Sequence, residues 1–184
     1  MASNILNTEN ALLLIIDIQE RLIAAQYSKD MITKNAAILA EAATILGVPV
    51  VASEQYPKGL GNTIPEIKEK LDESAKFFEK TAFSCVKQEG FLDLIKSCNR
   101  KQIIICGMES HICVHQTVTD LLNEGFEVHV VSDAISSRRE FECKIGMDRM
   151  VADGSVLTCV ETVVFEFLKS AKHPDFKAVQ GLIK

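Results

Sequence analysis

The segment GMESHICVH, residues 107–115, follows the apolar run QIIIC and holds the residues best suited to chemistry. Cys113 lies between His111 and His115, so it could be a nucleophile, one corner of an H-x-C-x-H metal site, or a buried thiol without chemistry. Ser110 is a favourable N-cap residue, which would place Cys113 in the first turn of a helix. The free N–H groups and the dipole of that turn favour a thiolate, and could also bind a negatively charged oxygen.

A metal site built from His111, Cys113 and His115 does not fit a helix. Residues i and i+4 share one helix face, whereas residue i+2 points almost the opposite way. The remaining histidines, His129 and His173, fall on an expected strand and in the tail, and zinc needs three or four ligands. We therefore expect no metal.

Apolar runs of strand length alternate with helical patterns along the chain. The first run, ALLLII at 11–16, is apolar throughout, as expected for a parallel strand covered on both faces. Further strands are expected at 48–53, 76–81, 102–106, 126–133 and 155–159, and helices at 31–46, 64–71, 91–97, 110–124, 140–152 and 160–169. Residues 55–65 are rich in Gly and Pro and are expected to form a loop. The alternation predicts an α/β fold, a Rossmann-like three-layer sandwich with an about six-stranded parallel sheet and helices on both faces.

No linker, repeat or low-complexity segment interrupts this pattern. We expect one domain over residues 1–184, with a core at about 10–168 and a C-terminal tail at 169–184. The tail could dock on its own body or on a neighbouring subunit. Its apolar residues at helical spacing are Phe176, Val179, Leu182 and Ile183.

Ligands of open α/β sheets bind beyond the carboxyl ends of the strands. Besides the segment 107–115, the expected strands deliver there Asp17-Ile18-Gln19, Ser53-Glu54-Gln55, Lys80-Thr81 and Ser132-Asp133. A carboxylate directly after an apolar strand is costly to bury without a partner. Asp17 therefore either caps the following turn or is paired and functional.

Composition excludes several classes of protein. The chain is 47% hydrophobic and 24% charged with a net charge of −5, so a nucleic-acid partner is not expected. The longest apolar run is too short to cross a bilayer, and the first residues lack the features of a signal peptide. Six cysteines without a C-x-x-C pair favour reduced thiols, so we expect a cytoplasmic protein. Those expected to be inert are Cys85, Cys98, Cys106, Cys143 and Cys159.

Three segments carry a family resemblance in the same order. LLLIIDIQ, FFEKTAFS and IIICGMESHICVHQTVTDLLNEGFEVHVVSDAISSR resemble the isochorismatase-like cysteine hydrolases, over residues from about 10 to 168. The stretches SEQYPKGLGNTIPE, KTAFS and GMESHICV are especially similar to the isochorismatase domain-containing proteins. The resemblance implies a catalytic triad of Asp17, Lys80 and Cys113. It further implies a cis peptide bond between Met108 and Glu109, and an oxyanion hole formed by the backbone amides of Glu109 and Cys113.

The chemistry of such a triad is coherent in itself. Lys80 near Cys113 is expected to lower the pKa of the thiol. Asp17 can accept the thiol proton and later activate water, so this role is now favoured over capping. Cys113 would attack an electrophilic carbon, a thioester would form, an amine would leave, and water would release the acid.

The sequence also departs from parts of the family pattern. Zinc-binding members carry an Asp-x-His and further histidines after the second strand, and SEQYPKGLGNTIPE contains no histidine. We therefore expect a metal-independent hydrolase that cleaves a C–N bond in a small amide or carbamoyl-type substrate. The alternatives are vinyl-ether hydrolysis, as in isochorismatases, and a non-catalytic interaction protein that retains the triad. A thiol-redox role lacks an evident resolving cysteine near Cys113.

The expected partners are a small-molecule substrate and further copies of the chain, as in the family generally. No cofactor is expected, because the glycines at 59 and 61 lack the spacing of a phosphate-binding loop. The residues that could line a substrate pocket are Gln19, Glu54, Tyr56, Phe83, His111 and Ile112.

Overall fold

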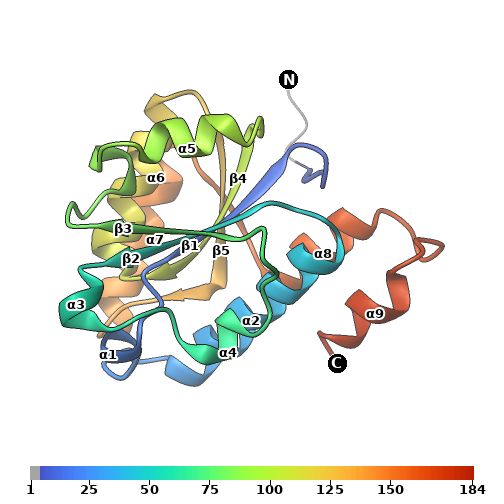
Figure 1. Cartoon of the computed structure of the whole chain (residues 1–184), viewed down its shortest axis with the longest axis horizontal. Coiled ribbons are helices and arrows are strands. Elements are labelled where there is room, and N and C mark those ends of the chain that lie inside the picture. The colour runs from blue at the N-terminus through green and yellow to red at the C-terminus, as the bar shows by residue number, and fades with distance from the viewer. Residues whose placement is uncertain (1–4) are drawn as a thin grey trace.

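A computed structural model describes residues 5–184 and shows one parallel sheet with helices on both of its faces (Figure 1). The six strands in it are β1 (Ala11–Ile16), β2 (Val50–Gln55), β3 (Lys76–Lys80), β4 (Gln102–Met108), β5 (Glu127–Ser136) and β6 (Val156–Thr158). Their order across the sheet is β3-β2-β1-β4-β5-β6, and every neighbouring pair is parallel. The predicted α/β fold is confirmed.

The strand order reverses between β1 and β4. From β1 the chain first builds outward to β2 and β3, and then returns to place β4 on the other side of β1. Ligand crevices of open α/β sheets lie at such a reversal, beyond the carboxyl ends of the strands. The residues that follow β1 and β4 therefore meet at this crevice.

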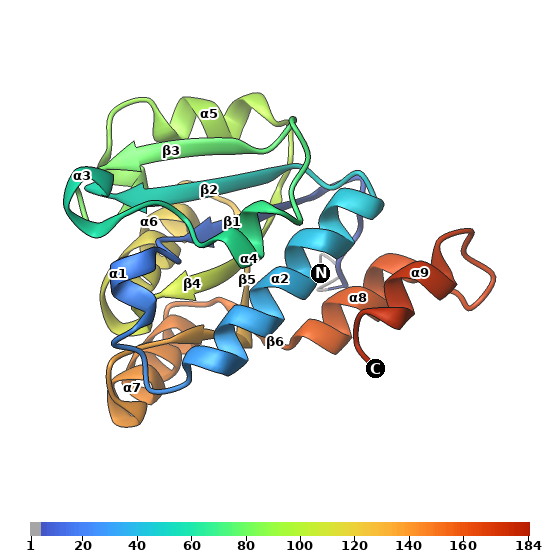
Figure 2. The same cartoon turned by 60° about the horizontal axis from the view of Figure 1, so that its bottom comes forward.

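Helices cover the two faces in two groups (Figures 1 and 2). One face carries α2 (Lys29–Ile45), α4 (Pro65–Lys68), α8 (Val160–Leu168) and α9 (Phe176–Gly181), and the other carries α5 (Phe91–Ser97), α6 (His115–Asn123) and α7 (Glu140–Ala152). The short helices α1 (Glu20–Ile23) and α3 (Pro57–Leu60), a 3₁₀ turn (Cys85–Lys87) and a π-helical turn (Ser110–Val114) complete the described part. None of these helices is both long and apolar enough to cross a membrane.

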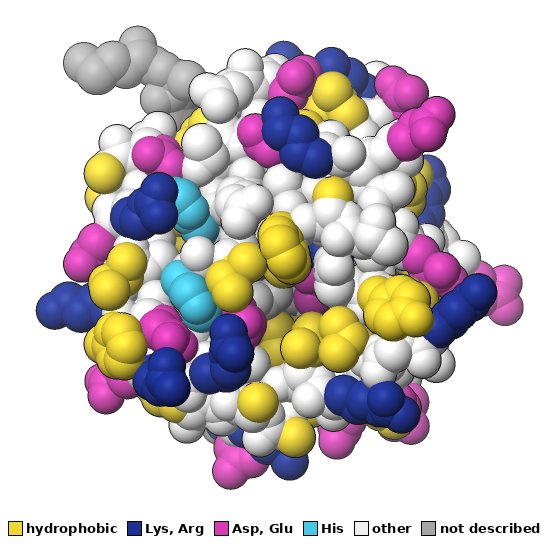
Figure 3. All heavy atoms as spheres, turned by 90° about the vertical axis from the view of Figure 1, so that its left-hand side faces the viewer, with side chains coloured by type: hydrophobic (Ala, Val, Ile, Leu, Met, Phe, Trp, Pro, Cys, Tyr) yellow, Lys and Arg dark blue, Asp and Glu magenta, His cyan; other side chains and the backbone are white. Residues whose placement is uncertain are grey.

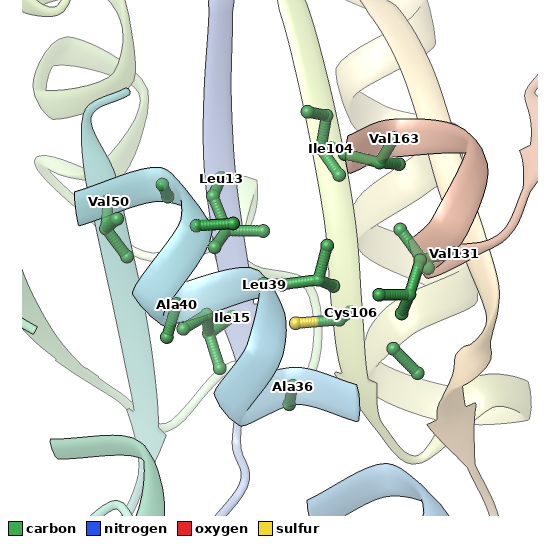
Figure 4. Close-up of a cluster of buried hydrophobic side chains, with 14 of the residues drawn as sticks. Leu13, Ile15, Ala36, Leu39, Ala40, Val50, Ile104, Cys106, Val131 and Val163 are labelled. Carbon is green, nitrogen blue, oxygen red and sulfur yellow. The ribbon is translucent and has the colours of Figure 1, made fainter. Parts of the chain in front are cut away.

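The apolar side chains of β1 divide between two cores. Ala11, Leu13 and Ile15 face the side of α2, whereas Leu12, Leu14 and Ile16 face the side of α5 and α6. This division follows from the two-residue period of a strand, and explains why the whole run is apolar. Figure 4 shows Leu13, Ile15 and Cys106 facing α2, where small residues such as Ala36 and Ala40 pack beside Leu39.

Three local features differ from the sequence prediction. Residues 57–60, expected in a loop, form α3, because Pro57 at the first helical position supplies a suitable φ. The short helix α1 was not predicted. Strand β5 was expected to end at residue 133, but it continues to Ser136, because Ile135 and Ser136 pair with Gly107 and Met108 beyond a register shift.

The tail packs on its own chain. Val179 in α9 is fully buried, and Phe176 lies 6.5 Å from Phe165 of α8 between ring centroids. Leu182 and Ile183 are partly buried against the same core. Of the two arrangements left open by the sequence, the structure shows docking on its own body.

Candidate active site

Asp17 lies directly after β1, in the left-handed backbone region with φ 53°, and is completely buried. Both of its carboxylate oxygens have donors. The Ser53 hydroxyl donates to Oδ1 at 2.7 Å, and Lys80 Nζ donates to Oδ2 at 2.7 Å. Asp17 is thus a paired buried carboxylate, which removes the electrostatic objection to its position.

Lys80 ends β3, and its side chain is fully buried. Besides Asp17, its ammonium donates to Gln55 Oε1 at 2.7 Å and to the carbonyls of Ala82 and Phe83 at 3.2 Å. Burial is the largest influence and opposes the charged form, but the facing Asp17 carboxylate, together with Cys85 and Cys113, holds the pKa of Lys80 above its usual value. Because acceptors surround the ammonium, Lys80 acts as a fixed cation.

Cys113 lies in the π-helical turn Ser110–Val114 and is 8% exposed. Burial first, and the Asp17 charge second, raise the pKa of the Cys113 thiol to about 12, although Lys80 acts in the opposite direction. The Asp17 carboxylate therefore lies near enough to the thiol to favour its protonated form. Lys80 lowers the pKa of the thiol, as predicted, but burial and Asp17 outweigh its effect. The resting site holds a protonated thiol beside a carboxylate.

The turn that presents Cys113 is held by backbone contacts. Gly107 has φ 135°, and a Cβ there would overlap the backbone of Ile16. The peptide bond between Met108 and Glu109, the bond named from the sequence, is cis. The carbonyl of Glu109 then accepts hydrogen bonds from the amides of Ile112 and Val114.

Ser110 does not cap the helix as predicted. Its hydroxyl donates to the carbonyl of Ser136 at 3.0 Å, which ties the turn to the end of β5. The side chain of Glu109, which precedes the turn, instead pairs with Arg138 at 2.8 Å. The extension of β5 to Ser136 brings this competing acceptor to Ser110. Ser132 and Asp133, expected at the carboxyl end of the strand, lie within it.

The two histidines that flank Cys113 have different partners. His111 Nδ1 lies 2.9 Å from Ser137 Oγ, and His115 Nε2 lies 3.2 Å from Asp153 Oδ2. Across residues 5–184, no three His, Cys, Asp or Glu side chains gather as metal ligands.

Two of the expected pocket residues are buried and engaged in structural hydrogen bonds. The Gln19 amide donates to the carbonyls of Gln55 and Gly61 and accepts from the Gln55 amide. Glu54 Oε1 accepts from both the amide and the hydroxyl of Thr63. These hydrogen bonds hold the segment 55–63 against the carboxyl ends of β1 and β2.

The other four expected pocket residues are accessible. Tyr56 and Phe83 are exposed, at 55% and 57%, and His111 and Ile112 are partly buried. Tyr56 and Lys80 contribute to a cavity of about 280 Å³. Figure 3 shows the face beyond the strand ends, where hydrophobic side chains gather around a hollow and charged side chains surround them.

Three neighbours of the triad were given no role from the sequence, although Ser53 and Gln55 were expected at the same edge of the sheet. Ser53 and Gln55 hold Asp17 and Lys80, as described above. Cys85, expected to be inert, is fully buried, and burial together with Asp17 raises its pKa to about 11. The two-residue period of β2 could have indicated Ser53 and Gln55, because it places them on one face of the sheet.

Comparisons with known proteins place the chain in a family. The isochorismatase domain model matches residues 11–162. The isochorismatase domain-containing protein 1 of Salmo salar is 40% identical over 169 residues, which cover 91% of this chain and 59% of that protein. The chain therefore spans under two thirds of that relative's length.

Two solved structures extend the comparison. The MAR1 ribonuclease from Caenorhabditis elegans has a TM-score of 0.92 and 38% identity, covering 97% of this chain and 91% of that one. YcaC from Pseudomonas aeruginosa, solved with hexane-2,5-diol and covalent acrylamide, has a TM-score of 0.92 and 26% identity, covering 99% and 93%. On the evidence of the matched domain and these relatives, the chain belongs to the isochorismatase domain family.

Proposed function

We propose that this protein is a metal-independent cysteine hydrolase that cleaves a C–N bond in a small amide or carbamoyl-type substrate. The observation that carries the proposal is the buried pair of Asp17 and Lys80, joined at 2.7 Å, whose carboxylate acts on the Cys113 thiol. A protonated thiol with a pKa of about 12 needs an adjacent base to become a nucleophile at neutral pH. Asp17 is that base.

In the first step the thiol proton passes to Asp17 while Sγ attacks the carbonyl carbon. The negative charge moves to the carbonyl oxygen, which the backbone amides of Glu109 and Cys113 would stabilise. Lys80 remains protonated throughout, because its ammonium is surrounded by Asp17, Gln55 and two carbonyls. Its charge offsets the negative charge that the pair of Asp17 and Cys113 carries.

In the second step protonated Asp17 gives its proton to the departing nitrogen. The C–N bond breaks, the amine leaves, and a thioester remains on Cys113. Asp17 then removes a proton from a water molecule that attacks the thioester. The tetrahedral intermediate that results breaks its C–S bond and releases the acid, and the proton on Asp17 returns to Sγ.

One relative supports a reactive nucleophile in this fold. The Pseudomonas aeruginosa protein was solved with covalent acrylamide, a small electrophile that carries an amide group. The presence of Cys113 beside the Asp17 and Lys80 pair favours C–N hydrolysis over vinyl-ether hydrolysis, because an acid alone can protonate a vinyl ether without a thiol. An interaction protein would not require this arrangement.

A substrate screen tests the proposal. Purified wild type, Cys113→Ser and Asp17→Asn would be offered small amides, N-carbamoyl compounds, isochorismate and, because of the Caenorhabditis elegans relative, RNA. Cys98→Ser is the matched control, since this thiol is only partly buried and its recorded hydrogen bond is to Leu94. We expect turnover of an amide or carbamoyl compound that both triad variants lose and the control keeps.

The other outcomes separate the alternatives. Isochorismate turnover that survives Cys113→Ser but not Asp17→Asn would indicate vinyl-ether chemistry, and RNA cleavage that needs the triad would indicate a nuclease. Equal turnover of every compound by wild type and both triad variants would sink the catalytic assignment.

We also infer a reducing, cytoplasmic environment. All six cysteines are free, and Cys85, Cys106, Cys113 and Cys143 are buried as thiols. Such a set suits a compartment that keeps thiols reduced.

A further inference from the structure

The outer face of α7 (Glu140–Ala152) exposes several large apolar side chains, whereas the outer face of an ordinary surface helix is polar. Phe141, Ile145 and Val151 are 59%, 50% and 46% exposed. A hollow of about 480 Å³ lies beside them and is lined by Tyr27, Glu140, Phe141, Lys144, Met147, Asp148 and Leu157. Figure 2 shows α7 at the margin of the molecule, at the opposite end from β3.

The inner face of α7 is fixed by Gly146. A Cβ at this position would lie 2.7 Å from the carbonyl carbon of Ser110 and 2.9 Å from the amide of His111. The helix therefore rests directly on the turn that carries Cys113. Because successive residues turn by about 100°, the middle of the exposed face lies opposite Gly146, between Lys144 and Asp148.

We propose that this face binds α7 of a second copy of the chain, antiparallel and around a two-fold axis at the level of Gly146. Such an axis brings together residues that are equally distant from Gly146 along the helix. Lys144 then meets Asp148 of the second copy, and Phe141 meets Val151 of the second copy. By symmetry each contact occurs twice.

Charge complementarity favours a second copy as the occupant. Lys144 and Asp148 are exposed, and neither side chain makes an ion pair or a hydrogen bond within residues 5–184. The antiparallel arrangement pairs each of them with an opposite charge, while apolar residues at 141 and 151 lie on either side. In such a contact the opposite charges fix the position of one helix along the other, and the apolar side chains bury surface, as expected of a specific interface.

The interface would also brace the active site. Since Gly146 rests on the backbone of Ser110 and His111, the second copy would lie one helix away from the turn that presents Cys113. Docking would restrict movement of α7 away from this turn. The inference does not depend on which substrate the site takes.

Charge exchange tests the pairing. Lys144→Asp, Asp148→Lys and the double exchange would be compared with wild type by sedimentation velocity over a range of concentrations. Each single exchange places like charges opposite each other twice, so we expect the dissociation constant of the two-fold contact to rise at least about tenfold. The double exchange restores opposite charges and should return the dissociation constant to near the wild-type value.

Two controls keep the result interpretable. Lys172→Asp makes the same charge change in the exposed tail and should leave assembly unchanged. Circular dichroism and thermal melting would show that every variant is folded. A wild type that stays monomeric at all concentrations overturns the proposal, as do single exchanges without effect or a double exchange as impaired as the single ones.

Discussion

Replacing Asp17 by Asn should change how the alkylation rate of Cys113 depends on pH. The Cys113 thiol has a pKa of about 12, because burial and the Asp17 charge outweigh Lys80. At pH 7.5 only about 3 in 100,000 such thiols are ionised, against about one in ten for an ordinary cysteine with a pKa near 8.5. A reaction through ionisation to solvent alone would therefore be about 3,000-fold slower than that of free cysteine.

Removal of the thiol proton by Asp17 while Sγ attacks avoids this penalty, because no free thiolate has to form first. The pair keeps its number of protons up to the transition state, so the rate of this route does not depend on pH while the carboxylate is ionised. We expect wild-type Cys113 to react with iodoacetamide at a nearly constant rate between pH 6 and 9. In Asp17→Asn the proton must go to solvent, and the rate should rise about tenfold per pH unit up to the pKa of the thiol. That pKa should be lower than in wild type, because the charge that raises it is gone.

The assay is the rate of label incorporation into the Cys113 peptide, measured by mass spectrometry after quenching at timed intervals. Cys98, which is partly buried, provides an internal reference in the same digest and should show the ordinary rise with pH in both proteins. A wild-type rate for Cys113 that rises tenfold per pH unit, parallel to the variant, would refute the role of Asp17 as base. The wild-type slope decides this even if the variant folds poorly.

Three further predictions concern the support of the site. Asp17→Asn leaves the Lys80 ammonium buried without its carboxylate and should lower the free energy of unfolding by about 3–5 kcal/mol, whereas adding Lys80→Met should recover much of it in a chemical-denaturation cycle. Ser53→Ala removes a donor to the Asp17 carboxylate, so it should lower the free energy of unfolding by about 1.5–3 kcal/mol and slow the labelling of Cys113. Ser53→Thr keeps the hydroxyl and should restore both. Unchanged labelling in Ser53→Ala would contradict this role. Gly107→Ala should cost at least about 2 kcal/mol, because its Cβ overlaps the backbone of β1, whereas Gly125→Ala, where φ is +83° and space is open, should cost only about 1 kcal/mol. Equal denaturation midpoints for the two glycine variants would show that the close approach of the strands is unimportant.

Local sequence patterns, the apolar runs and the helical spacing of apolar residues, predicted most of the fold. The apolar runs located all six strands, and the period of the helices between them placed α2, α5 and α7 within two residues of their ends. The end of β5 was missed because it depends on a non-local pairing. Ile135 and Ser136 rejoin β4 only after a register shift, and nothing in their own residue types indicates it.

The same non-local pairing explains the error at Ser110. A serine before an apolar helical pattern is a good N-cap by propensity. Because β5 extends to Ser136, however, the Ser110 hydroxyl donates to the carbonyl of Ser136 at 3.0 Å. The helical segment then begins with a π-helical turn instead of a capped α-helix. The effect of Lys80 on the pKa of Cys113 was predicted with the correct sign, but the net rise could not be, since the balance of burial, carboxylate and ammonium depends on distances in three dimensions.

The order of the strands explains why the cation of the site is a lysine and why its ammonium contacts the side-chain amide of Gln55. Lys80 ends β3, Asp17 follows β1, and β2 lies between them, so the two side chains and the 2.7 Å hydrogen bond that joins them must together span two strand spacings, about 10 Å. Only a long side chain can do so, and it needs an acceptor on the strand that it crosses. Gln55 at the end of β2 supplies that acceptor at 2.7 Å without a charge of its own. A carboxylate at this position would compete with Asp17 for the ammonium, so the neutral amide keeps the charge of Lys80 directed at the base.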